Sequence, residues 1–406
     1  MVSAAVIEIP GHVPPDRIVD IPFWDRRLTD VNPFDSLVSE ASHGPNIGYA
    51  RNFFPISERG AWVPRRGRHL REIYADIEHF SKNNASAYAR IIGEDWLMIP
   101  TELDHPVHAD FRASLNPTFS PAKMASLDGW VRERARELIA KFKDDGECEF
   151  ISQFATLFPV SIFLTLFGLP QDEVDQFLEW ERVFMRGTDM EHRKNTVRAV
   201  KARLMEEIHD RIRNPKDDMI SNALGLKVGG RNWTVDEVFG HCFNLFLGGL
   251  DTVTANLGWH FLHLANNPED QARLRENPRD AIVAIEELLR SYAAVTTARK
   301  CVKRYEIDGI VIEPGDFVAM STTIVGRDAE QFADPDVVDF DRKATHLTFG
   351  FGMHRCIGQH LARRELQLGM QEVLAAIPQF RLKENSELRF QTGTIVHVDT
   401  LHLAWN

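Results

Sequence analysis

Most apolar residues between positions 122 and 376 recur with the period of an amphipathic α-helix. This spacing predicts helices over residues 124–141, 151–167, 171–185, 193–213, 234–267, 281–292 and 358–376. Alternating residues over 305–321, 388–390 and 394–403 predict short strands, with a hairpin turn at Asp308-Gly309. No repeat or linker divides the chain. We therefore expect one α+β domain over residues 1–406, mainly α with a smaller β-rich part.

The longest predicted helix spans residues 234–267 and would be ~50 Å long. A capping box of Thr234 and Glu237 begins it, and the Asn-Asn-Pro sequence at 266–268 ends it. Its middle is unusual, because two adjacent glycines precede an acid and a hydroxyl, Asp251-Thr252, in an otherwise apolar run. One interpretation is a kinked core helix whose threonine bonds back to its own backbone. The other is that the glycines admit a flat group beside the helix.

Composition narrows the class of protein. The formal net charge of −12 argues against nucleic-acid binding. The four cysteines form no C-x-x-C pair, which favours a reducing cytoplasm. The most apolar stretch, residues 154–169, is interrupted by Thr156 and Pro159, so we expect a buried helix and no membrane span.

The candidate chemistry centres on Cys356. Three glycines surround this residue in the sequence Phe-Gly-Phe-Gly-Met-His-Arg-Cys-Ile-Gly at 349–358, and a strongly helix-forming segment follows. A cysteine in a tight loop at a helix N-terminus is favoured as a thiolate, because unpaired N–H groups and the helix dipole stabilise negative charge. A thiolate is a metal ligand or a nucleophile.

The spacing Phe-x-x-Gly-x-x-x-Cys-x-Gly closely resembles the haem-ligand loop of the cytochrome P450 family. Gly248-Gly249-Leu250-Asp251-Thr252 is similar to the family's oxygen-activation motif, and Glu287-Leu-Leu-Arg290 to its structural Glu–Arg pair. More narrowly, these segments and the Ile99-Pro100-Thr101 loop resemble the camphor 5-monooxygenase subfamily. The resemblance implies haem b between the long central helix and the helix that follows the Cys loop.

The resemblance assigns roles to individual residues. Cys356 would be the axial ligand of the haem iron, and Asp251 and Thr252 would form the catalytic proton path. A second group would contact the haem and its propionates: His108, Arg112, Gly248, Arg299, Phe349 and His354. Glu287 and Arg290 would have a structural role only.

Substrate would be held mainly by shape and apolar contact. The candidate pocket residues are Trp96, Met98, Thr101, Asn244, Leu247, Val295 and Ile395. The subfamily's substrate-binding tyrosine is replaced by Trp96, whose indole N–H is bulkier and points elsewhere. Asn244 adds an amide to an otherwise apolar position.

The implied activity is hydroxylation of a small hydrophobic substrate, such as a terpenoid or norisoprenoid, with O2. The chain contains no G-x-G-x-x-G fingerprint, so electrons would come from a [2Fe-2S] ferredoxin and its NAD(P)H-dependent reductase. Arg112, Arg355, Arg363 and Arg364 are expected near the docking face.

Four alternatives stay open at this stage. The substrate could be a small aromatic, or the chain could be a peroxide-driven peroxygenase, although such enzymes typically lack the Asp-Thr pair. A haem sensor or carrier without monooxygenase activity would have no use for Asp251-Thr252. An enzyme that uses Cys356 as a nucleophile without haem has no Cys–His–Asn order to support it beyond His354.

Overall fold

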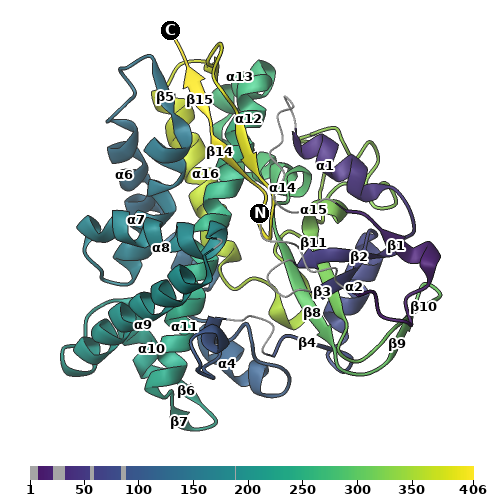
Figure 1. The fold of residues 1–406 in the computed structure, drawn as a ribbon. Coiled ribbons are helices and arrows are strands. Elements are labelled where there is room, and N and C mark those ends of the chain that lie inside the picture. The colour runs from purple at the N-terminus through teal and green to yellow at the C-terminus, as the bar shows by residue number, and fades with distance from the viewer. Residues whose placement is uncertain (1–7, 22–32, 55–58, 84–87, 188) are drawn as a thin grey trace.

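A computed structural model describes residues 8–21, 33–54, 59–83, 88–187 and 189–406 of the chain (Figure 1). Helices form about half of the structure. Most of them gather on one side of the molecule, and a six-stranded sheet with α1, α2 and α15 beside it forms the other side (Figure 1). The predicted mainly helical α+β fold is confirmed.

Sixteen α-helices occur in the part of the chain that the structure describes. Their bounds are α1 Pro33–Ser42, α2 Gly67–Ala75, α3 Tyr88–Ile91, α4 Val107–Leu115, α5 Pro121–Ala125, α6 Asp128–Ile139, α7 Leu157–Leu166, α8 Val174–Arg186, α9 Met190–Arg213, α10 Met219–Gly225, α11 Val235–Gly249, α12 Asp251–Asn266, α13 Pro268–Glu276, α14 Ala281–Ser291, α15 Thr322–Val325 and α16 Gln359–Ala376. Shorter helical turns lie at Pro15–Arg17, Ile151–Ala155, Gln171–Glu173, Pro278–Asp280 and Gly352–His354.

The strands are short. Their bounds are β1 Ile18–Val19, β2 Ile47–Phe54, β3 Arg59–Pro64, β4 Phe80–Ser81, β5 Glu147–Glu149, β6 Lys227–Val228, β7 Arg231–Asn232, β8 Thr296–Cys301, β9 Tyr305–Ile307, β10 Ile310–Ile312, β11 Phe317–Ser321, β12 Arg381–Leu382, β13 Arg389–Gln391, β14 His397–Thr400 and β15 His402–Ala404. The largest sheet has the order β1-β2-β3-β11-β8-β4, in which β8 pairs antiparallel with β11 and places Arg299 opposite Val318. The predicted hairpin at Asp308-Gly309 joins β9 to β10, and both turn residues have positive φ.

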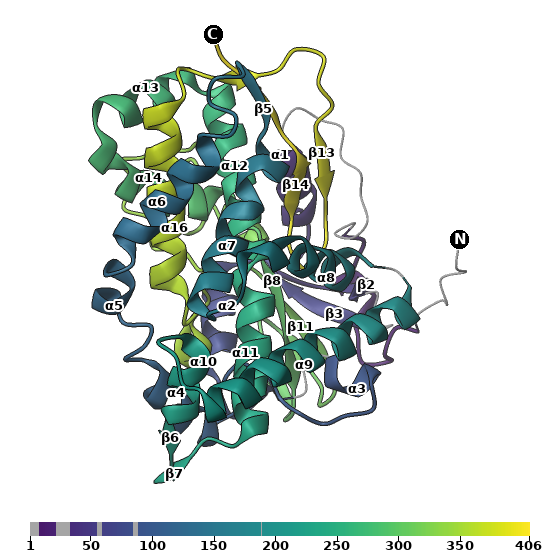
Figure 2. The same ribbon diagram turned by 90° about the vertical axis from the view of Figure 1, so that its left-hand side faces the viewer.

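The helix predicted over 234–267 is two helices, α11 and α12, separated at Leu250. Thr234 forms the predicted capping box with Glu237. The break follows the two glycines, which have the lowest helix propensity of the non-proline residues. Figure 2 shows α11 and α12 running through the helical side, with α8 and α9 crossing in front of them.

Other helix boundaries differ from the predicted ranges. The predicted helix 124–141 divides into α5 and α6, and the Ser126 hydroxyl at the end of α5 donates to the carbonyl of Lys123, three residues earlier.

 The two oxygens of that hydrogen bond are 2.7 Å apart, and the bond closes α5 at its last turn. Helices α1, α10 and α13 were not predicted, since short helices show too few turns for a clear period.

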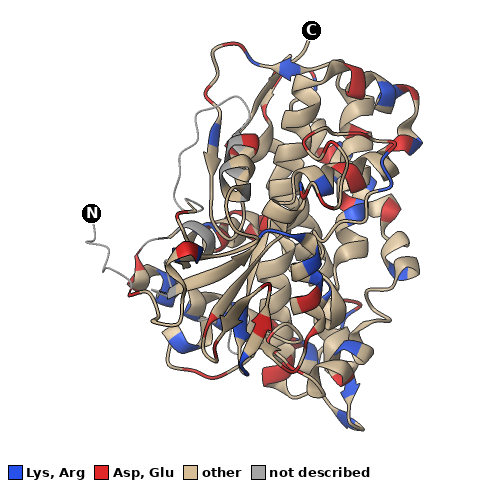
Figure 3. Ribbon diagram, turned by 90° about the vertical axis from the view of Figure 1, so that its right-hand side faces the viewer, with Lys and Arg blue, Asp and Glu red and all other residues tan. Residues whose placement is uncertain are grey.

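Among the described residues, no helix is both long enough and apolar enough to cross a membrane. Figure 3 shows Lys and Arg interspersed with Asp and Glu over the face that it presents, so the charges there do not gather into one block of a single sign.

Candidate functional site

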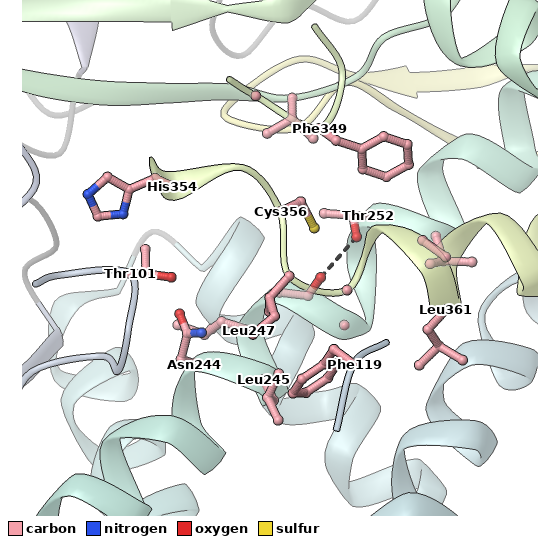
Figure 4. A pocket seen from close by; sticks show the side chains of 18 of the residues that line it. Thr101, Phe119, Asn244, Leu245, Leu247, Thr252, Phe349, His354, Cys356 and Leu361 are labelled. Carbon is pink, nitrogen blue, oxygen red and sulfur yellow. Dashed lines mark hydrogen bonds between the residues drawn. The ribbon is translucent and has the colours of Figure 1, made fainter. Parts of the chain in front are cut away.

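A cavity of about 400 Å³ lies between helices α7, α11, α12 and α16, strand β8 and the loop that carries Cys356. Its lining is mostly apolar. Thirteen of the predicted site residues line it: Met98, Thr101, His108, Arg112, Asn244, Leu247, Gly248, Thr252, Val295, Arg299, Phe349, His354 and Cys356. Figure 4 shows several of them around the cavity, with Cys356 on the loop and Thr252 on α12.

The Cys356 loop is held by its own backbone and by two glycines. The amide of Cys356 donates to the carbonyl of Phe349 at 2.8 Å. Gly350 and Gly352 have φ angles of 71° and 69°, a region that side chains rarely adopt. A Cβ on Gly352 would lie 2.8 Å from the carbonyl oxygen of Tyr74, so the loop also needs glycine there for close packing.

Two opposing effects act on the Cys356 thiol. Burial raises its pKa above the ordinary value, and this is the largest effect. The backbone N–H groups of Gly358 and Gln359 bond to the sulfur and, with the nearby Arg112 guanidinium, lower the pKa. Because the Cys356 side chain is itself exposed to the cavity, the raised pKa reflects the enclosing walls and applies to the protein alone, whereas a bound metal ion would deprotonate the thiol outright.

The wall opposite Cys356 is formed where α11 meets α12. Both Gly248 and Gly249 face open space, since a Cβ built on either would have no heavy atom within 4 Å. The Thr252 hydroxyl donates back to the carbonyl of Gly248 at 3.0 Å, as Figure 4 shows. The two interpretations of this segment thus hold together, because the helix is broken and the glycines also leave room beside it.

Five basic side chains line one part of the cavity: Lys82, His108, Arg112, Arg299 and His354. We call them the basic cluster. His108 and Arg299 are 2% and 3% exposed, and the rings of His108 and His354 lie 4.4 Å apart. Among the described residues, no carboxylate lies within ion-pair distance of any of the five. The Nε2 atom of His108 is buried without a hydrogen-bond partner there.

Burial and mutual repulsion weaken the affinity of this cluster for protons. Burial, and next the charge of Arg112, lower the pKa of His108 to about 4. Burial, followed by Arg299, lowers the pKa of Lys82 to about 7. Burial also lowers the pKa of the Arg299 guanidinium, whose ring neighbour Tyr74 lies 5.0 Å away. Such a cluster would be stabilised by an anion with carboxylate oxygens.

Asp251 lies outside this cavity. It is 2% exposed and lines a second, smaller cavity of about 50 Å³ behind the helix break, together with Glu181 and Asp399. Asp251 and Thr252 are thus adjacent in sequence but face different cavities. Their pairing in one proton path stays a prediction.

Trp96 and Ile395 do not line the main cavity, in contrast to their predicted place in the substrate pocket. The indole N–H of Trp96 donates to Glu94 at 2.6 Å, and Lys201 of α9 pairs with the same carboxylate. The ring packs edge-on against Phe239 and Phe243 of α11, which turns it away from the cavity. Ile395 is buried and pairs through its backbone with Val295, the residue that reaches the cavity in its place.

Glu287 and Arg290 of α14 lie outside the cavity and form the predicted ion pair, with 2.7 Å between Oε1 and Nη2. Both are fully buried.

Several cavity residues were not predicted. Lys82, Asn256 and Glu365 line the cavity, and the last two are 5% and 3% exposed. Asn256 lies one helical turn after Thr252, so its position on the same face of the helix could have indicated it. No local pattern marks Lys82, which reaches the cavity from the position directly after the short strand β4.

Comparison with known proteins places these features in a family. The model of the cytochrome P450 family matches residues 169–393. "Probable cytochrome P450 127A1" of Sinorhizobium fredii is 35% identical over 403 residues, which are 98% of this chain and 97% of that protein. The crystal structures of cytochrome P450 CYP101C1 and of CYP101J2 are similar with TM-scores of 0.87 and 0.85, at 32% and 28% identity. They cover 98% of this chain and 100% and 99% of their own chains.

Proposed function

This chain belongs to the cytochrome P450 family of haem b monooxygenases, and we propose that it hydroxylates a small terpenoid or norisoprenoid. We further propose O2 as oxidant, a [2Fe-2S] ferredoxin as electron donor, and one domain over residues 1–406 in the cytoplasm. One observation carries the proposal: a mostly apolar cavity with Cys356 on one wall, Thr252 on the other and the basic cluster at one part.

The residues present fit haem b. The basic cluster provides buried donors without carboxylate partners in the described chain, and the orphaned Nε2 of His108 is one of them. Haem b carries two carboxylates, which His108, Arg112, Arg299, His354 and Lys82 would hold. The space beside Gly248 and Gly249 suits a flat ring, and Phe349 would pack against it.

Cys356 would bind the haem iron through its sulfur. The N–H groups of Gly358 and Gln359 would bond to its sulfur and moderate its negative charge. When bound, a haem–thiolate centre supplies the chemistry that activates O2 for insertion into a C–H bond.

Proton supply would depend on Asp251 and Thr252. The Thr252 hydroxyl donates to the carbonyl of Gly248 and would turn toward the cavity to donate there instead. The Asp251 carboxyl would relay a proton from the smaller cavity behind the helix break at Leu250 toward the Thr252 oxygen.

Substrate would be held by Met98, Leu247 and Val295, with the Thr101 hydroxyl and the Asn244 amide as polar contacts. The Asn244 side chain is partly exposed to the cavity among apolar neighbours, so it would orient a ketone, ether or hydroxyl group. Trp96 is left out of this set, because its N–H is already bonded to Glu94.

Electron donation requires a docking surface near Cys356. Arg355 precedes the cysteine and is exposed, whereas Arg363 pairs with Glu286 and Arg364 with Asp128. Arg355 is therefore the basic side chain of this group with most freedom to meet an acidic ferredoxin.

A titration of the haem-loaded protein with camphor, a cineole, an ionone and a substituted benzoate tests this function. The expected result is a shift of the Soret band to shorter wavelength with the ionone or cineole, and product formation with ferredoxin, reductase, NADH and O2. Absence of a Soret band after haem supplementation would contradict the haem assignment. A shift with the benzoate alone would overturn the terpenoid assignment.

A further inference from the structure

Two walls of the main cavity adjoin each other, and one of them is a loop. This loop, residues 94–103, has no helix or strand of its own. It contributes three residues to the lining: Met98, Pro100 and Thr101. The adjoining wall is the second half of α11, which includes Asn244. The width of the cavity between these two walls therefore depends on how the loop is held against α11.

The backbone of Ile99 bonds to the first half of α11 in both directions. Its amide donates to the carbonyl of Gly240 at 3.3 Å, and its carbonyl accepts from Nδ1 of His241 at 3.1 Å. Because a carbonyl only accepts, Nδ1 carries the hydrogen. Both residues are buried, and burial lowers the pKa of His241 to about 4, so the ring is neutral near pH 7. A buried peptide group of an irregular loop is thus satisfied by one turn of a helix.

Gly240 permits the closest approach of the loop to the helix. A Cβ built on it would overlap the carbonyl oxygen of Leu97, which is a backbone atom and cannot turn aside as a side chain can. One helical turn along, the ring of Trp96 packs edge-on against Phe239 and Phe243. Loop and helix are therefore at the smallest separation that their backbones allow at this point.

The contact at Gly240 also reaches the lining of the cavity. In an α-helix the carbonyl of residue 240 accepts from the amide of Asn244, four residues later. The amides of Ile99 and Asn244 thus converge on one oxygen, which links the backbone of one wall to the backbone of the other. Figure 4 shows a side chain from each wall at the cavity, Thr101 from the loop and Asn244 from α11.

We propose that Gly240 and His241 are positioning residues that set the width of the cavity between the loop and α11, and that they thereby select the substrate by its size. Neither residue lines the cavity. They act through Ile99 on its neighbours Met98 and Thr101, which do. The inference deepens the proposed function and rests on it, because the two walls are those that would hold the substrate.

The first test uses azoles, which bind a haem iron through a ring nitrogen whatever the natural substrate is. Imidazole is too small to span the two walls, whereas the aryl rings of clotrimazole must fit between them. His241→Leu removes the donor to Ile99 and frees the loop to move off α11. The affinity of the haem-loaded protein for clotrimazole relative to imidazole should then rise ~2–10-fold, read from the shift of the Soret band to longer wavelength.

The conservative variant His241→Asn separates positioning from packing. The Asn side chain keeps an N–H donor close to the position of Nδ1, so the wild-type ratio of affinities should return. A wild-type ratio in His241→Leu would overturn the positioning role. An equal change in His241→Leu and His241→Asn would overturn it as well, because the effect would then not depend on the hydrogen bond.

The second test adds a methyl group between the walls. Gly240→Ala should raise the ratio at least as much as His241→Leu, and the KM for an ionone relative to a cineole should fall with little change in kcat. Gly258→Ala is the matched control: Gly258 is a buried glycine of α12 whose Cβ would meet Ile151 and Val398 at 3.2 Å, away from the cavity. Equal changes in the two glycine variants would overturn the assignment to Gly240. If Gly240→Ala does not fold, the two His241 variants decide.

Failure of this inference is distinguishable from failure of the proposed function. If no terpenoid shifts the Soret band but the azole ratios change as expected, the substrate assignment fails and the positioning role stands. If the protein binds no haem, amide hydrogen exchange over residues 96–101 of the apoprotein decides the contact. Exchange there should be faster in His241→Leu than in His241→Asn, and equal exchange in both would overturn the fastening by His241.

Discussion

Two groups of buried charges in this molecule differ in how they are compensated. Arg290 and Glu287 are fully buried and satisfied within the chain. The guanidinium makes two bonds to the carboxylate and three to the carbonyls of Gly326, Pro335 and Val337, all at 2.7–3.1 Å. His108 and Arg299 of the basic cluster are nearly as deeply buried, yet the Arg299 guanidinium makes one hydrogen bond of 3.1 Å, to the carbonyl of Ala298, and faces the ring of Tyr74.

The difference separates a structural role from a binding role. A buried ion pair whose hydrogen bonds are all made locks the chain around it, and loss of one partner leaves a costly unpaired charge. Buried cations without carboxylate partners destabilise the ligand-free protein. They are tolerated where a bound ligand supplies the missing anion. The sequence motifs do not distinguish the two groups, whereas the hydrogen-bond and ion-pair partners of each group do.

The largest effect is expected from Cys356→Ala, which removes the proposed iron ligand and leaves both groups of charges in place. The haem-loaded variant should lose the thiolate-type spectrum and all product formation. Urea unfolding of the apoprotein should change by less than ~1 kcal/mol, since the side chain packs against the open cavity. An unchanged spectrum would contradict the ligand assignment.

The Arg290→Ala variant tests the compensated group. It leaves Glu287 buried and unpaired, so the free energy of unfolding should fall by ~3–5 kcal/mol, measured by urea denaturation of the apoprotein. Lys303→Ala is the control, because it breaks the exposed pair with Glu78 and should change stability little. Equal losses in the two variants would remove the distinction between buried and exposed pairs.

The Arg299→Met variant tests the uncompensated group and should behave in the opposite way. The apoprotein should be as stable as the wild type or more so, because a buried charge without a partner is replaced by an apolar chain of similar length. Haem affinity should fall ~10–100-fold, as expected when a charge-assisted hydrogen bond of ~1.5–3 kcal/mol is lost. Transfer of haem to apomyoglobin measures this loss. A destabilised apoprotein with normal haem affinity would assign Arg299 to the fold.

The features that were predicted correctly from the sequence depend on the spacing of residues within short segments. The Cys356 loop, the capping box at Thr234 and the two glycines before Asp251 all lie within short segments, where residue type and backbone conformation are directly linked. The break at Leu250 follows from those glycines, although the pattern alone was also compatible with one continuous helix.

The features that sequence missed depend on segments far apart in the chain. Trp96 was expected in the pocket, but Glu94 and Lys201, 107 positions apart, draw its indole N–H outward. Lys82 joins Arg299 only because β4 pairs with β8. No period or motif contains such contacts, because they arise when the sheet and the helices pack.

The smallest effect expected is a pH dependence that distinguishes the apoprotein from the haem-loaded protein. The pKa of His108 is about 4 in the folded chain, below the ~6.5 of an unfolded histidine. Between these values the unfolded chain binds more protons, so stability falls as the pH is lowered from ~6.5 to ~4 and does not change from this cause above that range. We expect His108 to contribute on the order of 1–2 kcal/mol to the stability that the apoprotein loses between pH 7 and pH 5, measured by urea unfolding.

Two variants and the haem-loaded protein test whether this loss of stability comes from the basic cluster. His108→Asn should remove the His108 share only, since burial also lowers the pKa of His241, His260 and His354, and His209→Asn, at an exposed position on α9, should leave the loss unchanged. Haem should also reduce the loss, because two carboxylates beside His108 would raise its pKa toward the unfolded value. The same acid sensitivity in the apoprotein and the haem-loaded protein would mean that His108 does not face the propionates. The uncompensated charges of the cluster would then need another anion to explain them.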